Sequence, residues 1–330
     1  FTISGGRTKT HQPALIVSLS LGRFTGYGEA PAISYYNITT DGMVADLEKK
    51  KNFVEKFAFT DPERYWHYLH HLFPHNPFLV CALDMAGWDL YGQMKGMPLY
   101  KIWDTSLGDV PLTDYTIGIA SEAEMIQKIK AFPWPVYKIK AGFENDVEVI
   151  ATLRKHTDAI FWVDANGGWT IDEALQKIPV LKELGVELIE QPLHKDDTAL
   201  MKILVQQSPL PLFADESCVF ETDVEKCAGL FHGINIKLTK CSGITPARRM
   251  VQKANELDLK VMMGCMNEST IGSAAIAHFL PQLDYVDMDG PLLLAEDMAT
   301  GLGYNTGKVS ITERPGLGIA MKINESQAWF

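Results

Sequence analysis

From about residue 112 onward, short runs of apolar and β-branched residues alternate with amphipathic stretches, and the pattern repeats about every 25 residues. The apolar runs predict β-strands, and the amphipathic stretches, such as 146–155 and 245–257, have the spacing of helices. Strands that alternate with helices are typical of parallel βαβ units. The expected strands cover 114–120, 136–141, 161–166, 188–192, 212–217, 234–239, 260–266 and 285–289.

Eight strands at this spacing suit a closed α/β barrel better than an open sheet, where six strands are more usual. An open doubly wound sheet remains an alternative. A dinucleotide-binding fold is disfavoured, because no GxGxxG sequence follows an early strand.

The first 110 residues have a different pattern. Residues 14–21 and 24–27 predict a hairpin with its turn at Leu21-Gly22-Arg23, and helices are expected at 40–57, 62–72 and 80–93. We therefore expect two domains. An α+β domain spans 1–110 and is completed by a tail at about 295–330, and a barrel spans 111–294.

Composition and charge exclude several classes of function. The 330 residues are 46% hydrophobic and 22% charged, and the net charge of -11 argues against nucleic acid or an anionic membrane as a partner. No apolar run approaches the roughly 18 residues of a membrane span, and no signal peptide is evident. Five cysteines without zinc-like spacing fit reduced thiols in a cytoplasmic protein.

Charged residues stand at the ends of most expected barrel strands. In parallel barrels these ends open into the active site, and a ring of buried charges there is costly unless the charges pair or bind something. The residues concerned are Lys138, Lys140, Asp164, Glu190, Asp215, Lys237, Asp287 and Asp289.

Three of these residues, Asp164, Glu190 and Asp215, end successive strands about 25 residues apart. Converging carboxylates repel one another and need a cation. A set of oxygen ligands without His or Cys favours Mg2+ or Mn2+.

Two lysines occupy strands that face each other across an eight-stranded barrel. Lys140 ends the second expected strand and Lys237 lies in the sixth. A lysine near a bound cation loses its proton more easily and can act as a general base. Two bases on opposite faces of one carbon are what racemisation or epimerisation requires.

Five motifs, taken in order, resemble the muconate-lactonising branch of the enolase superfamily: KIK at 138–140, VDAN at 163–166, EQP at 190–192, ADES at 214–217 and KLTK at 237–240. The stretch Gly26-Tyr-Gly-Glu29-Ala30-Pro31 is similar to that family's capping domain. The resemblance implies a (β/α)7β modified TIM barrel under an α+β cap. It also implies that Lys140 and Lys237 form the acid/base pair.

The same resemblance assigns the other polar residues of the motifs. It implies that Asp164, Glu190 and Asp215 hold Mg2+, and that Lys138 is an auxiliary positive charge near the substrate carboxylate. Lysine bases acting with magnesium are the general pattern of enolase-superfamily sites.

The DxD sequence at 287–289 distinguishes among the activities of this branch. It resembles the dipeptide epimerases, whose aspartates hold the substrate's α-ammonium group. Asp287 and Asp289 point to the same face of a strand, and a buried ammonium needs carboxylate acceptors. Cys265, at the end of the seventh strand, joins them as an expected substrate contact.

A loop at about 4–13 predicts the second residue of the substrate. Its Arg7 resembles an arginine of relatives that act on Ala-Glu dipeptides. The expected activity is therefore L-Ala-D/L-Glu epimerisation of a dipeptide from cell-wall peptide.

Several alternatives remain open: an N-acylamino acid racemase, an o-succinylbenzoate synthase, an epimerase of hydrophobic dipeptides, or a non-catalytic barrel. The sequence does not fix the oligomeric state, although many family members form homo-oligomers.

Overall fold

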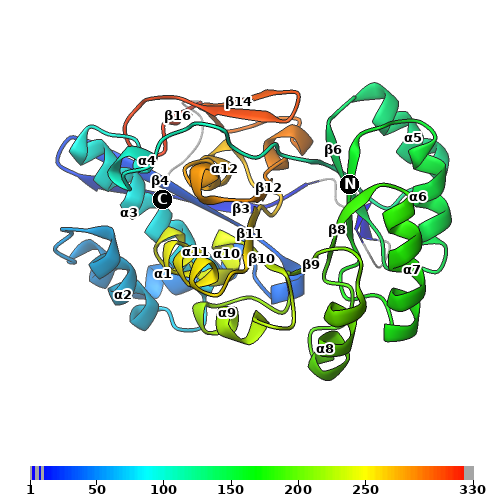
Figure 1. Cartoon of the computed structure of the whole chain (residues 1–330). Helices are drawn as coiled ribbons and strands as arrows, with labels where there is room; N and C mark the ends of the chain where they lie inside the picture. Colours follow the sequence, from blue (N-terminus) through cyan, green and yellow to red (C-terminus); the bar gives the residue numbers. More distant parts are fainter. Residues whose placement is uncertain (1, 4–6, 9–10, 323–330) are drawn as a thin grey trace.

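The structure is a computed structural model that describes residues 2–3, 7–8 and 11–322, with side chains from residue 11 onward. Its centre is one eight-stranded parallel sheet in the order β12-β11-β10-β9-β8-β7-β6-β5 (Figure 1). A parallel bridge between Thr113 and Val286 joins the two edges and closes the barrel. The strands are β5 (Tyr115–Ile117), β6 (Val136–Lys140), β7 (Ile160–Asp164), β8 (Val186–Glu190), β9 (Leu212–Ala214), β10 (Gly233–Ile236), β11 (Lys260–Gly264) and β12 (Tyr285–Asp287).

Helices occupy each of the seven connections between these strands, while a 3-10 turn, η3 (Gly290–Leu293), follows β12. The barrel is therefore of the (β/α)7β type, and the expected fold class is confirmed; the open sheet was the wrong alternative. The helices are α5 (Glu122–Ala131), α6 (Asp146–Arg154), α7 (Ile171–Glu183), α8 (Thr198–Gln207), α9 (Glu221–Cys227), α10 (Leu238–Cys241), α11 (Ile244–Glu256) and α12 (Thr270–Ala277).

The N-terminal part is an antiparallel hairpin packed on helices. Strands β3 (Ala14–Leu21) and β4 (Phe24–Pro31) pair along their whole length, as the sequence predicts. The helices are α1 (Thr40–Glu55), α2 (Pro62–Leu72), α3 (Pro77–Lys95) and α4 (Leu99–Ile102), and η1 (Ser34–Tyr36) precedes them. A short pair, β1 (Thr2–Ile3) and β2 (Arg7–Thr8), stands before the hairpin.

Glycines allow β4 to lie directly on α3. A Cβ atom added at Gly26 would lie 2.2 Å from the carbonyl oxygen of Ala86, and one at Gly28 would lie 1.9 Å from that of Ala82. Only residues without a side chain fit at such a distance. The two glycines of the GYGEA stretch therefore have a packing role. Glu29 follows directly after the point where β4 contacts α3.

The C-terminal tail returns to the N-terminal helices. It contains β13 (Ala299–Thr300), β14 (Leu302–Asn305), β15 (Lys308–Ile311) and β16 (Ala320–Met321). The carboxylate of Asp89 in α3 accepts hydrogen bonds from the backbone N–H groups of Tyr27 in β4 and Leu317 in the tail, each at 2.8 Å. The domain boundaries at 110 and 294 stay predictions.

All eight barrel strands end earlier than the sequence suggests, and the sixth also changes conformation beyond its end. The sixth strand was expected at 234–239, but β10 ends at Ile236 and residues 238–241 form the helical turn α10. The backbone N–H groups of Lys240 and Cys241 both donate to the carbonyl of Lys237, and Ser242 ends the turn at a φ of 75°. This turn brings the side chains of both Lys237 and Lys240 into contact with the carboxylate of Asp215.

Two further properties follow from the described residues. None of their helices is long and apolar enough to cross a bilayer. All five cysteines are buried and form no disulfide.

Candidate active site

The inside of the barrel changes from apolar to charged along the strands. Near the bottom, five buried side chains from neighbouring strands pack together: Val136, Trp162, Leu188, Phe213 and Met262. Residues two positions further along a strand point to the same face. On four of these strands they are Lys138, Asp164, Glu190 and Asp215, all buried.

The three acids expected to hold a metal are paired with lysines. Lys138 Nζ lies 2.6 Å from a carboxylate oxygen of Glu190 and 3.5 Å from one of Asp164. Burial opposes ionisation, but Lys140 and Lys138 hold the pKa of Asp164 below its usual value. Burial and the charge of Asp164 raise the pKa of Glu190.

The two lysines expected to act as acid and base lie on different carboxylates. Lys140 Nζ is 2.6 Å from Asp164 Oδ2, and Lys237 Nζ is 2.8 Å from Asp215 Oδ2. Their strands, β6 and β10, are four positions apart in an eight-stranded barrel and therefore face each other. Burial disfavours the charged form of Lys237, but Asp215 and other carboxylates raise its pKa well above the usual value.

Two neighbouring residues that the sequence reading did not assign hold these acids in place. Lys240 is fully buried, and its Nζ donates to Asp215 Oδ1 at 2.5 Å and to the Asp215 carbonyl at 2.6 Å. Asn235 Nδ2 donates to Glu190 Oε1 at 2.8 Å. Gly264 on β11 leaves room for this amide, because a Cβ there would lie 2.7 Å from Asn235 Oδ1.

The DxD aspartates lie together at the end of β12, as expected. Oxygen atoms of Asp287 and Asp289 and the sulfur of Cys265 lie within 4.8 Å of one another. Asp287 Oδ2 is 2.7 Å from Lys138 Nζ, and Asp289 Oδ2 accepts the Thr116 N–H at 2.7 Å. Burial, and next the charge of Asp287, raises the pKa of Asp289 to about 6.

A further buried acid, Glu268, lies where the loop after β11 enters the site. Burial, followed by the charge of Glu29, raises its pKa to about 8. Its Oε2 is buried and has no hydrogen-bond partner among the described residues. A neutral carboxylic acid of this kind can donate a hydrogen bond to a developing negative charge. The MNES sequence at 266–269 contained Glu268, but nothing in the spacing separated this role from a structural one.

The N-terminal part is fixed to the barrel beside this loop. The Glu29 carboxylate of β4 accepts hydrogen bonds from Ser269 N at 3.0 Å, Ser269 Oγ at 2.6 Å and Gly272 N at 3.0 Å. These donors belong to the first turn of α12, where a carboxylate is also favoured by the helix dipole. The cap therefore sets the position of the loop that carries Glu268.

The predicted specificity residue Arg7 lies in β2, and its side chain is outside what the structure describes. The cap contributes Tyr36 of η1 instead, whose ring packs on Phe78 at 5.7 Å. Tyr36 lines the same pocket as Glu216 and Lys240. Burial, and next the charge of Asp215, raises the pKa of Tyr36.

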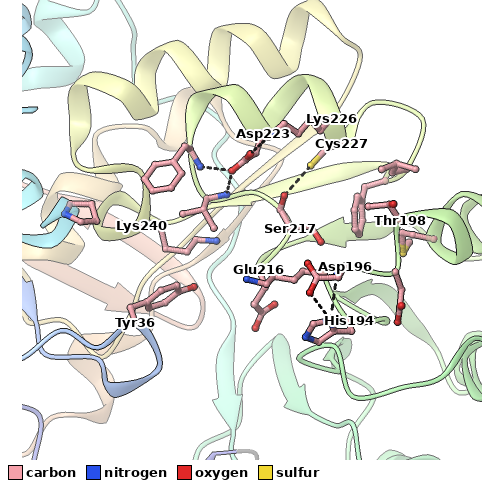
Figure 2. A pocket seen from close by; sticks show the side chains of 18 of the residues that line it. Tyr36, His194, Asp196, Thr198, Glu216, Ser217, Asp223, Lys226, Cys227 and Lys240 are labelled. Atoms are coloured by element: carbon pink, nitrogen blue, oxygen red, sulfur yellow. Dashed lines mark hydrogen bonds and ion pairs between the residues drawn. The ribbon is translucent and has the colours of Figure 1, made fainter. Parts of the chain in front are cut away.

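A pocket of about 670 Å³ borders the acid cluster on the side of β8 and β9. Figure 2 shows Tyr36 and Lys240 on one side of it, His194 and Thr198 on the other, and Glu216 between them. Since Lys240 also donates to Asp215, this pocket adjoins the expected metal ligands.

The acid set fits a divalent cation by its chemistry. Asp164, Glu190 and Asp215 are buried, supply only oxygen atoms, and come from adjacent strands, which is the donor type that Mg2+ prefers. All three are in contact with lysines, so a cation bound to them would take over charge compensation that lysine ammonium groups now supply.

A capped (β/α)7β barrel with carboxylates on successive strands and two facing lysines defines an enzyme of the enolase type. Residues 120–326 match the family described as Enolase C-terminal domain-like, and the chain belongs to this family. The family expected from the motifs is thus confirmed.

Individual relatives resemble the chain over almost its full length. It is 48% identical over 321 residues to the L-Ala-D/L-amino acid epimerase of Flavobacterium johnsoniae, covering 97% of this chain and 95% of that protein. The substrate-liganded L-Ala-D/L-Glu epimerase of Bacillus subtilis has a TM-score of 0.88 at 30% identity, covering 93% of this chain and 91% of that one. A dipeptide epimerase of Cytophaga hutchinsonii, solved with Mg and D-Ala-L-Val, has a TM-score of 0.91 at 26% identity, covering 98% and 92%.

Proposed function

We propose that this chain is a Mg2+-dependent dipeptide epimerase that inverts the α-carbon of the second residue, with L-Ala-D/L-Glu as its main substrate pair. The observation that carries the proposal is the placement of Lys140 and Lys237 on opposite strands of one charged barrel mouth. The names of the relatives support the dipeptide, and the Arg7 position supports glutamate as its second residue.

The metal would be held by Asp164, Glu190 and Asp215, and the relative that was solved with Mg supports the choice of metal. Mg2+ bound there would act as a Lewis acid on the substrate carboxylate and stabilise the charge that develops when the α-proton leaves.

The protein's own residues divide the proton transfer between them. A neutral lysine on one face of the α-carbon takes the proton, and the protonated lysine on the other face returns one, which inverts the centre. The carboxylates that raise the pKa of Lys237 are the same groups that are expected to hold the metal. Compensating their charge would remove the reason why this lysine is held in its charged form.

Asp287 and Asp289 would hold the substrate's α-ammonium group. Both aspartates are buried. If the substrate carried no positive charge, the described cation nearest to them would be Lys138, which also pairs with Glu190. This argues against an N-acylamino acid racemase or an o-succinylbenzoate synthase. Asp287→Asn distinguishes the dipeptide epimerase from these two alternatives. The substitution should weaken substrate binding only if the substrate carries an ammonium group.

The direct experiment is incubation with Mg2+ and L-Ala-L-Glu in D2O, followed by NMR of both α-protons. We expect the glutamate α-proton signal to disappear while L-Ala-D-Glu appears and the alanine α-proton stays. If no dipeptide in a panel with acidic, small and apolar second residues exchanged its proton, the proposal would be wrong.

The choice of glutamate is tested separately. Arg7→Ala should lower kcat/KM for L-Ala-L-Glu by about one to two powers of ten, the value of a charge-assisted hydrogen bond, and leave L-Ala-L-Leu unaffected. Equal rates for the two dipeptides in the wild-type protein would instead favour an epimerase of hydrophobic or mixed specificity.

A further inference from the structure

Asp114 is a buried acid that the proposed reaction does not use. It immediately precedes β5, is 0% exposed, and shares the inward face of that strand with Thr116. Thr116 Oγ1 lies 3.5 Å from Asp114 Oδ2, while Asp114 Oδ1 has no hydrogen-bond partner among the residues that the structure describes. A buried carboxyl oxygen without a partner costs free energy and requires an explanation.

The neighbours of Asp114 are the aspartates of the DxD pair. The bridge between Thr113 and Val286 closes the barrel and brings residue 114 beside Asp287. Two positions further, the Thr116 N–H donates to Asp289 Oδ2, so Thr116 lies beside both Asp114 and Asp289. Burial, and next the charges of Asp287 and Asp289, raises the pKa of Asp114 well above its usual value.

Among the residues whose side chains the structure describes, one charged lysine faces these three carboxyl groups. Lys138 on β6 is 2.7 Å from Asp287, acts on Asp114 electrostatically, and is shared with Glu190 at 2.6 Å. The other titratable groups near the DxD pair add no positive charge; they are Cys265, which follows β11, and Tyr115, Glu268 and Tyr304. Buried carboxylates that share one lysine repel one another, and this repulsion favours a protonated Asp114 until another cation arrives.

We propose that Asp114 is the third acid of the ammonium pocket, a positioning residue that carries a proton in the free enzyme and releases it to solvent when the substrate's ammonium group binds. This inference rests on the proposed function. Asp114 would ionise only when a cation binds beside it. The positive charge of the substrate's ammonium group would then replace the charge of the proton that Asp114 loses. Asp114 thereby strengthens binding of a cationic substrate without touching the reacting carbon.

The role predicts a separation of kinetic effects. Asp114→Asn preserves volume and neutrality but cannot ionise, so KM for L-Ala-L-Glu should rise about tenfold, the equivalent of ~1.4 kcal/mol, while kcat changes little. A carboxyl group with a purely structural, neutral role would tolerate the amide, and KM would stay at the wild-type value. Asp109→Asn, an exposed change shortly before β5, is the matched control.

Proton release provides a second measurement that needs no variant. Calorimetric titration of the Mg2+-loaded wild-type protein with L-Ala-L-Glu, in two buffers of different ionisation enthalpy at about pH 7.5, counts the protons released. A proton that the wild type and the Asp109→Asn control release and Asp114→Asn does not is assigned to Asp114. We expect release of close to one proton from the wild type and the Asp109→Asn control, and none from Asp114→Asn.

The outcomes separate this inference from the proposed function. If the wild type epimerises L-Ala-L-Glu but releases no proton, or if Asp114→Asn matches it in KM and proton count, the role of Asp114 is refuted and the epimerase stands. If the wild type exchanges no dipeptide α-proton, the epimerase itself is refuted. If Asp114→Asn does not fold, the wild-type proton count still tests the role, because a wild type that binds the dipeptide and releases no proton refutes it.

Discussion

The two-lysine arrangement can be tested by removing one lysine at a time, as Lys140→Ala and Lys237→Ala. Each variant should lose epimerisation by about a thousandfold or more, because a positioned general acid or base contributes typically 10²–10⁴-fold. A thousandfold loss corresponds to about 4 kcal/mol of transition-state stabilisation. The informative result is what each variant retains.

Each variant should still exchange one diastereomer with solvent. The remaining lysine can remove the α-proton that faces it and return a deuteron to the same face. Lys140→Ala and Lys237→Ala should therefore exchange opposite members of the L-Ala-L-Glu and L-Ala-D-Glu pair. NMR in D2O, with each dipeptide supplied separately, measures this selectivity.

The structure indicates that both variants will fold. Removal of one partner of a buried ion pair often costs ~3–5 kcal/mol, because a charge is left uncompensated. Here Asp164 would keep Lys138 at 3.5 Å, and Asp215 would keep Lys240 at 2.5 Å. We therefore expect a smaller loss of stability, which chemical denaturation would show.

Lys260→Ala is the matched control for these variants. This lysine starts β11 at the opposite end of the barrel and pairs with Asp284 on the surface. It should leave both exchange and epimerisation unchanged. Epimerisation within about tenfold of wild type by either active-site variant, or exchange of the same diastereomer by both, would refute the two-base reasoning.

Three further predictions concern the frame of the site and its titration. Gly28→Ala should destabilise the protein by about 1–3 kcal/mol or more in urea denaturation, because its Cβ would lie 1.9 Å from a backbone oxygen of α3. Gly22→Ala, in the turn of the same hairpin with nothing within 4 Å, should cost only its positive-φ strain of about 1 kcal/mol, and equal losses would contradict the packing argument. Glu29→Ala leaves the donors of Ser269 without their acceptor and should cost about 1–3 kcal/mol in the same assay, while Glu29→Gln recovers part of it; no difference between the two would argue against the hydrogen bonds. Glu268 binds a proton more strongly folded than unfolded, so its contribution to stability should be lost as pH rises from about 4.5 to about 8, and Glu268→Gln should flatten the fall in Tm over that window; parallel Tm profiles would refute the raised pKa.

The sequence predicted the barrel and most of the charged ring for one physical reason. Parallel strands at a regular spacing end on the same side, so residues such as Asp164 and Glu190, which end β7 and β8, were expected to meet. Alternation along a strand predicted that Asp287 and Asp289 share one face. In the structure β12 ends at Asp287, and Asp289 meets it from the turn before η3. These inferences need only the period of the pattern and the positions of strand ends.

Partners across strands could not be predicted in the same way. The bond from Asn235 to Glu190 depends on the register of β8 to β10 and on the space left by Gly264. The role of Lys240 could not be predicted, because the expected strand ran to residue 239 and left Lys240 outside it. The helical turn at 238–241 brings Lys240 back to Asp215. Asp114 precedes a three-residue strand, and only closure of the barrel shows which acids it meets.

Charge balance connects these hidden partners with the choice of substrate. Lysines 138, 140, 237 and 240 compensate the acids that are expected to bind metal. Of the lysines that the structure describes, Lys138 alone also forms an ion pair with the DxD pair. An N-acyl substrate would add a carboxylate to this mouth and no cation, so the buried aspartates would repel it or would have to be protonated. A dipeptide brings its own ammonium group to the position where the protein supplies too little positive charge. The preference for a free amino terminus would then arise from a deficit of lysine around Asp114, Asp287 and Asp289, as much as from any single contact.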